Sequence, residues 1–225
     1  MSQPDAIGPT PRTLAVRGVL ALNWPNLITT VRTAAAIVLG FVALVQADWV
    51  LLLIAYGTYW VGDIADGRVA RWLDQETRLG AVFDILCDRA CSTICIGALL
   101  VIRPEFAPAL CIYFIQFMVV DALLTMSFLH WPWLSSPNYF YRVDPLIYRF
   151  NWSQPAKAAN TSLLLALLLV SWWLHWPHWI AVVVAVAQLL VKFWSAARLL
   201  VLTTAEGTEP AGPLCDQRPH GRKAG

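Results

Sequence analysis

The sequence predicts an all-α integral membrane protein with six transmembrane helices and a short N-terminal interfacial helix. Of its 225 residues, 58% are hydrophobic and only 13% are charged, which is too apolar for a water-soluble domain of this length. The apolar residues lie in six blocks, each close to the ~20 residues that a membrane-spanning helix needs. The blocks run over residues 27–45, 49–72, 80–102, 106–129, 156–174 and 179–202.

The two ends of the chain differ in composition from these apolar blocks. Residues 1–12 contain three prolines and few apolar side chains, so we expect a disordered tail. Residues 13–22 alternate apolar residues with Arg17, a pattern typical of a short helix that lies on the membrane surface. A single membrane domain is therefore predicted over residues 13–204, followed by a disordered cytoplasmic tail over residues 205–225.

The distribution of lysine and arginine predicts the orientation of the spans. Basic loops stay on the cytoplasmic side, and Arg103 is the only basic residue assigned to an outer loop. The other basic residues that set the orientation are Arg12, Arg17, Arg71, Arg78, Arg142, Arg149, Arg218, Arg222 and Lys223. Both termini are therefore expected in the cytoplasm. The net charge of +2 is too small to indicate a nucleic acid, so membrane lipid is the expected partner surface.

Four aspartates interrupt the predicted spans two and three. Asp63 and Asp66 lie near the end of the second span, and Asp84 and Asp88 lie near the start of the third. An acidic side chain at the bilayer centre costs about 2.5–3.5 kcal/mol, so four of them need a cation or a water-filled cavity beside them. The four aspartates are therefore candidate functional residues.

The spacing of these residues predicts that they face one another. Asp63, Asp66, Gly67 and Ala70 recur at helical spacing on one face of the second span, and the two aspartates of the third span are four residues apart. Because residues 72–79 form a short link, the two spans must be antiparallel neighbours, and their acidic faces can meet near the cytoplasmic surface. An all-oxygen pocket of this kind suits Mg²⁺ or Mn²⁺ better than zinc.

The small residues and the arginine beside the acids indicate a diphosphate ligand. Gly67 and Ala70 leave room for a ligand to approach the helix, and Arg71 follows directly. Metal ions neutralise diphosphate oxygens, and a guanidinium binds them bidentately. Another interpretation is that the aspartates only form structural ion pairs with neighbouring arginines, namely Arg68, Arg71 and Arg89. Ion pairs alone, however, do not require Gly67 or Gly80.

The acidic motif resembles the complete signature of the CDP-alcohol phosphotransferases, also called CDP-alcohol phosphatidyltransferases. Every fixed position is filled, in the order Asp63-x2-Asp66-Gly67-x2-Ala70-Arg71-x8-Gly80-x3-Asp84-x3-Asp88. A second stretch is similar to an N-terminal element of that family and reads Pro25-Asn26-x2-Thr29-x2-Arg32. The resemblance covers most of the chain and leaves only the two tails outside.

The resemblance implies a six-helix membrane fold, usually in a homodimer, with a polar cavity open to the cytoplasm. It implies that Asp63, Asp66 and Asp84 hold two Mg²⁺ or Mn²⁺ ions. Asp88 would complete the metal site and act as general base on the acceptor hydroxyl, which an unactivated alcohol needs. The residues expected to contact the CDP group are Gly67, Ala70 and Arg71, with Gly80, Asn26 and Thr29 as weaker candidates.

The implied reaction is transfer of a phosphatidyl group from CDP-diacylglycerol to a small alcohol, with release of CMP. Residues 77–89 and 144–156 are similar to segments of phosphatidylinositol synthases, which favours inositol or a similar polyol as the acceptor. Two departures weaken this assignment: Gln154 replaces an arginine of that branch, and the Ser-His-Trp expected after Asp121 is not reproduced. The basic residues expected to contact the acceptor are Arg149, Lys157 and Lys192.

Other functions remain open from the sequence. A phosphorylated acceptor would make the protein a phosphatidylglycerophosphate or inositol-phosphate type of phosphatidyltransferase, and it needs about two cationic partners. A CDP-aminoalcohol phosphotransferase is a further enzyme alternative. A cation transporter would place charged residues around a midplane site, often between inverted repeats, whereas these acids cluster toward one side and no repeat is visible. A catalytically inactive homologue would require a lost acid or glycine, and none is lost.

Overall fold

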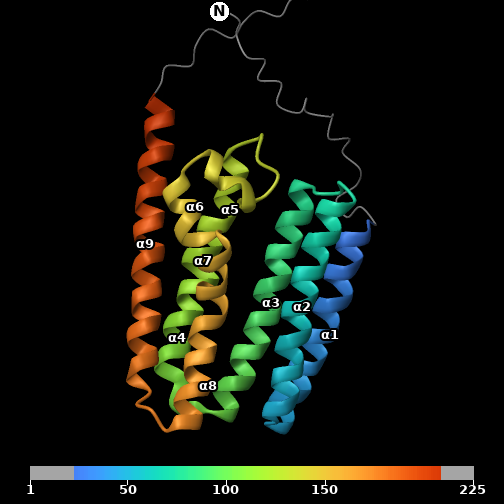
Figure 1. Cartoon of the computed structure of the whole chain (residues 1–225), viewed down its shortest axis with the longest axis vertical. Coiled ribbons are helices and arrows are strands. Elements are labelled where there is room, and N and C mark those ends of the chain that lie inside the picture. Colours follow the sequence, from blue (N-terminus) through green and yellow to red (C-terminus); the bar gives the residue numbers. More distant parts are fainter. Residues whose placement is uncertain (1–22, 209–225) are drawn as a thin grey trace, which may run out of the picture.

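A computed structural model describes residues 23–208 of the chain, and every regular element in this range is helical. The all-α prediction is therefore confirmed for the described residues. The predicted interfacial helix over residues 13–22 and the tail over residues 1–12 lie outside this range, as does most of the predicted C-terminal tail. Figure 1 shows two groups of helices side by side, with α1, α2 and α3 in one group and α4 to α9 in the other.

The first group contains three long helices, α1 (Trp24–Gln46), α2 (Trp49–Trp72) and α3 (Arg78–Ile102). Each begins at a polar residue whose side chain accepts hydrogen bonds from the first turn, which satisfies backbone groups that have no partner within the helix. Asn23 caps α1, Asp48 caps α2 and Thr77 caps α3. All three pairs of these helices are in contact, so α1 packs against both acidic helices.

The second group is more irregular. Its helices are α4 (Ala107–Ile115), α5 (Ala122–Met126), α6 (Pro145–Asn151), α7 (Gln154–Ala158), α8 (Leu164–Leu174) and α9 (Trp179–Thr208). The 3₁₀ segments are η1 (Pro104–Phe106), η3 (Ser127–His130) and η4 (Pro137–Arg142), and the π segments are η2 (Gln116–Asp121) and η5 (Ala159–Leu163). Elements η1 to η3 form one helical run, and α7 to α8 form another.

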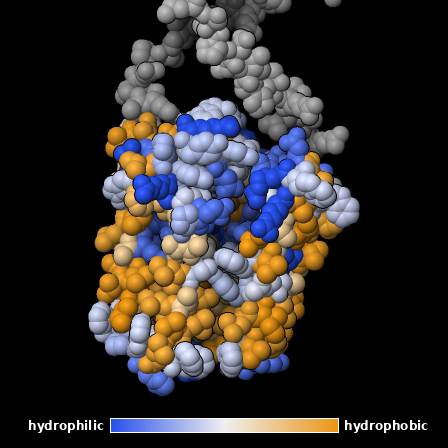
Figure 2. Space-filling view, viewed as in Figure 1, coloured by the Kyte–Doolittle hydropathy of each residue, from blue (hydrophilic) through white to orange (hydrophobic). Residues whose placement is uncertain are grey.

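Four helical runs are long and apolar enough to cross a membrane, and they make the chain an integral membrane protein. They are Trp24–Gln46, Arg78–Ile102, Pro104–His130 and Trp179–Thr204. Helix α2 has the length of a span, but its second half carries aspartates and arginines, and the apolar part of the α7–α8 run is the shorter Leu164–Leu174. These two of the six expected spans therefore stay predictions. Figure 2 shows hydrophobic residues over the lower part of one face and hydrophilic residues gathered at its upper end.

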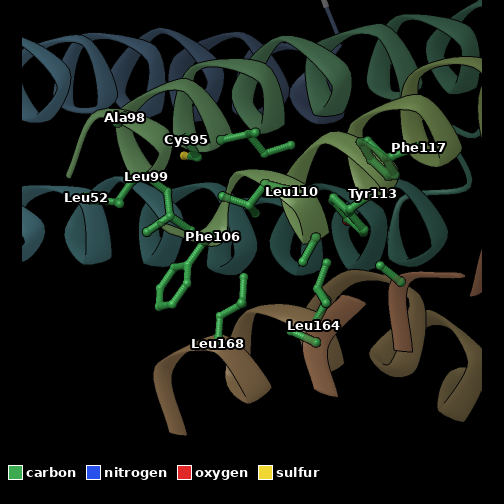
Figure 3. Packing of buried hydrophobic residues seen from close by; sticks show 14 of the residues in the cluster. Leu52, Cys95, Ala98, Leu99, Phe106, Leu110, Tyr113, Phe117, Leu164 and Leu168 are labelled. Carbon is green, nitrogen blue, oxygen red and sulfur yellow. The ribbon is translucent and has the colours of Figure 1, made fainter. Parts of the chain in front are cut away.

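The main apolar core lies at the end of the bundle remote from the upper, hydrophilic end. Figure 3 shows Leu52, Leu99, Phe106, Leu110 and Leu168 packed together from both groups of helices, and all are buried. Apolar contacts of this kind hold the two groups together.

Candidate functional site

The aspartates of α2 and α3 meet in space. Asp63 and Asp66 lie on the second half of α2, and Asp84 and Asp88 lie on the first turns of α3. Carboxylate oxygens of Asp63, Asp66 and Asp84 all lie within 4.8 Å of one another. The helical spacing explains this arrangement, because it places each pair of acids on one face and the short connection turns the two faces together.

Arg32 of α1 lies among these carboxylates, and the sequence pattern alone assigned it no role. Its Nε donates to Oδ2 of Asp66 at 2.7 Å, and its Nη2 donates to Oδ1 of Asp84 at 2.5 Å. The same Nη2 donates to Oδ1 of Asp88 at 3.0 Å and lies 3.6 Å from Oδ1 of Asp63. The available signal was its place seven residues after Pro25 in the N-terminal element, which the structure brings against the acidic motif.

Two further residues of the N-terminal element lie at the site. Thr29 is buried, and its hydroxyl donates to Oδ2 of Asp66 at 2.7 Å. The side-chain oxygen of Asn26 lies close to Gly80, since a Cβ atom added to this glycine would be 3.2 Å from it and 2.8 Å from Oγ1 of Thr77. The lack of a side chain at Gly80 therefore permits the close approach of α1 to the start of α3.

A cavity of about 450 Å³ lies beside the aspartates and receives residues from both groups of helices. Eleven of the thirteen residues expected to form the site line it. They are Asn26, Thr29, Asp63, Asp66, Gly67, Ala70, Arg71, Gly80, Asp84, Asp88 and Lys157. The volume is large enough for a polar ligand together with bound water.

The glycine and the arginine that follow the first two aspartates lie together at the cavity. A Cβ atom added to Gly67 would be 3.4 Å from Nη1 of Arg71, so the guanidinium lies directly beside the glycine. Arg71 is exposed, and both residues line the cavity. The guanidinium is therefore accessible to an anionic ligand that enters beside the carboxylates.

The second group of helices contributes a buried ion cluster to the far wall of the cavity. Asp121 on η2 lines the cavity, and its Oδ1 lies 2.6 Å from Nζ of Lys192 on α9. Its Oδ2 lies 2.5 Å from Nη2 of Arg89, the residue that follows Asp88 on α3. Lys192 also donates to the side-chain oxygen of Asn151 at 2.8 Å. Each carboxylate oxygen of Asp121 is thus paired with a cation.

The three basic residues expected to contact the acceptor lie in different places. Lys157 lines the cavity and donates to the side-chain oxygen of Asn138 at 2.5 Å. Lys192 is fully buried behind Asp121 and does not line the cavity. Arg149 is exposed on the face of α6 that is turned away from the buried Ile147, so it too is outside the cavity lining. Only Lys157 of these three is in a position to touch a ligand directly.

The donor groups of the site fit a hard divalent cation. Carboxylate oxygens are the ligands that Mg²⁺ and Mn²⁺ prefer, and three of them converge here. None of the described residues that line the cavity is a histidine or a cysteine, so the ligands that zinc prefers are missing from the described lining. Asp63, Asp66 and Asp84 are the residues whose carboxylates could together hold such an ion.

The sequence model of the family described as CDP-alcohol phosphatidyltransferase matches residues 22–194 of the chain. This region is more than half of the chain and contains the N-terminal element, the acidic motif and the ion cluster of the far wall. No curated protein and no solved structure gives a significant match to the chain.

Proposed function

The chain belongs to the CDP-alcohol phosphatidyltransferase family, and on that premise we propose that it transfers a phosphatidyl group from CDP-diacylglycerol to a small polyol such as inositol. Family membership makes the protein an enzyme of phospholipid synthesis that transfers substituted phosphate groups. The observation that carries the proposal is the cluster of four aspartates opening onto a cavity of about 450 Å³ in a membrane bundle.

Asp63, Asp66, Asp84 and Asp88 are the proposed ligands of Mg²⁺ or Mn²⁺. The convergence of three of these carboxylates within 4.8 Å supports this assignment. When bound, two such ions supply positive charge that neutralises the diphosphate oxygens of the donor and the leaving CMP. The family signature supports the same four residues, because each of its acidic positions is an aspartate here.

Asp88 is the proposed general base. Its side chain is partly exposed and lines the cavity, while Nη2 of Arg32 holds one of its oxygens at 3.0 Å. In the reaction, the acceptor hydroxyl oxygen forms a bond to the phosphatidyl phosphorus while the bond from that phosphorus to the CMP oxygen breaks. The hydroxyl proton moves to a carboxylate oxygen of Asp88, because an alcohol is a poor nucleophile until it loses its proton.

Residues along α2 are the proposed contacts of the CDP group. Arg71 is exposed at the cavity and would bind diphosphate oxygens through its two guanidinium nitrogens. Gly67 and Ala70 on the same face leave space for the ligand, and Asn26 and Gly80 lie on the adjoining wall. Thr29 already donates to Asp66, so we propose that it orients this carboxylate as well as lining the site.

The polar side chains beside the far wall suit the hydroxyl groups of a polyol acceptor. A phosphomonoester needs about two cations that are available to it. Arg89 and Lys192 share the single carboxylate of Asp121, which balances one of their two positive charges, and only Arg89 of the two lines the cavity. Lys157, Asn160 and Gln154 line the cavity and offer donors and acceptors that suit the hydroxyl groups of a polyol.

The cavity is proposed to open toward the cytoplasm. Arg71 and Arg78 flank the connection between α2 and α3, and Arg142 and Arg149 lie between the runs that end at His130 and begin at Gln154. Basic loops of this kind stay on the cytoplasmic side. A six-span homodimer, as in the family expectation, completes the proposal, and cross-linking of the protein in membranes tests the dimer.

The proposed reaction is tested by measuring CMP release from purified protein. CDP-diacylglycerol and Mg²⁺ or Mn²⁺ are supplied with inositol, inositol phosphate, glycerol 3-phosphate or serine, each in a separate reaction. Release that depends on inositol is expected, and release only with a phosphorylated alcohol would contradict the assignment of a neutral acceptor. Release only from CDP-choline or CDP-ethanolamine with diacylglycerol would move the protein to the aminoalcohol branch. Folded protein that releases CMP in none of these reactions would overturn the proposal.

A further inference from the structure

Arg32 reaches the aspartate cluster from inside the protein, on the side away from the cavity. Its side chain is only 3% exposed, and the residue is not part of the cavity lining. The side chains of Asp63 and Asp84 are 39% and 36% exposed, and both residues line the cavity. The carboxylates therefore lie between a buried guanidinium on one side and a space open to ligands on the other.

The guanidinium connects three helices through these carboxylates. Arg32 belongs to α1, its Nε is bonded to Asp66 on α2, and its Nη2 is bonded to Asp84 and Asp88 on α3. A planar guanidinium presents several N–H donors in a fixed geometry, so one arginine can hold carboxylates from two helices at once. Lysine, with a single point of charge, does not reproduce this geometry.

Neighbouring residues on α2 make room for the arginine. A Cβ atom added to Gly62 would lie 2.5 Å from both Cβ and Cδ of Arg32, which no real side chain could occupy without displacing the arginine. One helical turn earlier, the ring of Tyr59 lies 5.6 Å from the centre of the guanidinium, a distance at which a ring attracts a cation. Residues of α2 thus provide both the space and a ring contact for the Arg32 side chain, which is not a flexible surface contact.

The electrostatics of the cluster give Arg32 a specific task. Four carboxylates close together repel one another, and Asp66, which is 3% exposed, gains little from solvent. Divalent ions entering from the cavity would neutralise the cluster, but the helices have to assemble before such a site exists. Arg32 supplies positive charge on the interior side without occupying the face that is open to the cavity.

We propose that Arg32 is a positioning residue that acts as an internal counter-cation: it holds the four aspartates together before divalent ions bind, so that the fold of the site does not depend on metal. This inference rests on the proposed metal role of the aspartates. Removal of Arg32 should therefore make the stability of the protein depend on metal to a greater extent.

The test compares thermal unfolding of the full-length protein and its Arg32→Gln variant in detergent, with EDTA or with saturating Mn²⁺. In EDTA the variant should unfold at least about 5 °C below the parent protein, and in Mn²⁺ this gap should narrow to half or less, because the ions replace the missing charge. If the difference in unfolding temperature between parent and variant is as large in Mn²⁺ as in EDTA, or larger, Arg32 serves only in packing and the inference is overturned. Absence of any Mn²⁺ effect on the parent protein would instead overturn the metal site itself, and this inference with it.

Arg198→Gln is the matched control. It makes the same substitution and breaks a pair of the same length, since Nε of Arg198 lies 2.7 Å from Oδ2 of the buried Asp144, outside the cavity lining. Its unfolding temperature should fall equally in EDTA and in Mn²⁺. If Arg32→Gln does not fold in EDTA, Asp66→Asn added to it should restore folding, because the unpaired buried charge is gone. A double variant that stays unfolded in EDTA would overturn the inference.

Discussion

Lys192 on α9 and Asp121 on η2 form a buried ion pair, with 2.6 Å between Nζ and Oδ1. Neither residue has significant exposure, and Arg89 of α3 pairs with the second carboxylate oxygen. Through Arg89, this ion cluster links the two groups of helices at the cavity, next to Phe117 of the apolar core in Figure 3. Breaking it affects both stability and the shape of the far wall.

Lys192→Met should lower the free energy of unfolding by about 3 kcal/mol. Breaking a buried pair leaves an uncompensated charge and costs about 3–5 kcal/mol, and the value falls at the lower end because Arg89 still pairs with Asp121. Denaturant or thermal unfolding in detergent measures the change. Arg103→Gln, which removes the cation of the partly exposed pair with Glu105, should cost less than about 1 kcal/mol. Equal costs for the two variants would contradict the prediction.

Asp88→Asn should retain binding of the CDP-lipid and lower turnover at least ~100-fold. The amide keeps an oxygen that can accept the hydrogen bond from Arg32, but it cannot take up the acceptor proton. Equilibrium binding of a labelled CDP-lipid and CMP release measure the two properties separately. Asp74→Asn is the control, since Asp74 is exposed with a φ of 51°, a conformation that asparagine tolerates. Unchanged turnover in Asp88→Asn would remove the general-base assignment.

Gly62→Ala should destabilise the protein by about 1–3 kcal/mol, whereas alanine in most helices is stabilising. The added Cβ would be 2.5 Å from two atoms of the Arg32 stem, so either the helix or the arginine has to shift. Gly57→Ala and Gly97→Ala are matched controls, because nothing lies within 4 Å of a Cβ added there. Both should leave stability unchanged or raise it by up to about 1 kcal/mol. A control variant as unstable as Gly62→Ala would contradict this explanation.

The hydrogen bond between Tyr139 and Glu76 should stabilise the protein by an amount that changes with pH only in strongly alkaline solution. The Tyr139 hydroxyl donates to Oε2 of Glu76 at 2.6 Å, and this hydrogen bond, together with partial burial, raises the pKa of Tyr139 to about 12. A raised pKa means that the folded state favours the protonated phenol. The resulting stabilisation is fully present below the unfolded-state pKa of about 10 and is lost as the pH rises to about 12.

Tyr139→Phe tests this pH dependence. The difference in unfolding temperature between the parent protein and the variant should be constant from about pH 7 to pH 9 and should shrink above about pH 10. Titration of tyrosinate absorbance gives an independent measurement. The parent protein should contain a tyrosine that ionises near pH 12, and the variant should lack it. A stability difference that changes between pH 7 and pH 9 would show that another group is responsible.

The sequence predicted the helices of the first group closely. The block at residues 49–72 coincides with α2, and the block at 80–102 lies within α3, which begins two residues earlier at Arg78. The difference arises because the polar cap Thr77, which hydropathy does not detect, sets the start of the helix. The spacing also brought the aspartates together correctly, since a short connection leaves antiparallel packing as the natural arrangement.

The sequence could not assign Arg32 or locate Lys192 for a physical reason. Both residues contact partners that are distant in the sequence: Arg32 and Asp66 are 34 positions apart, and Lys192 and Asp121 are 71 positions apart. Only packing of α1 against α2 and α3, and of α9 against η2, brings these partners together. The sequence also did not predict the π segments, because a single wide turn does not change the pattern of hydrophobic residues in an apolar block.

Helix α2 has a consequence for how the chain enters a membrane during synthesis. Its second half carries Asp63 and Asp66 together with Arg68 and Arg71, so it lacks the hydropathy that drives a helix into lipid on its own. Its neighbours α1 and α3 have that hydropathy and flank it both in the sequence and in the bundle. Helix α2 therefore depends on the helix made before it and the helix made after it, and a ribosome-bound chain that ends at Trp72 should hold α2 in the membrane less firmly than one that continues to Ile102.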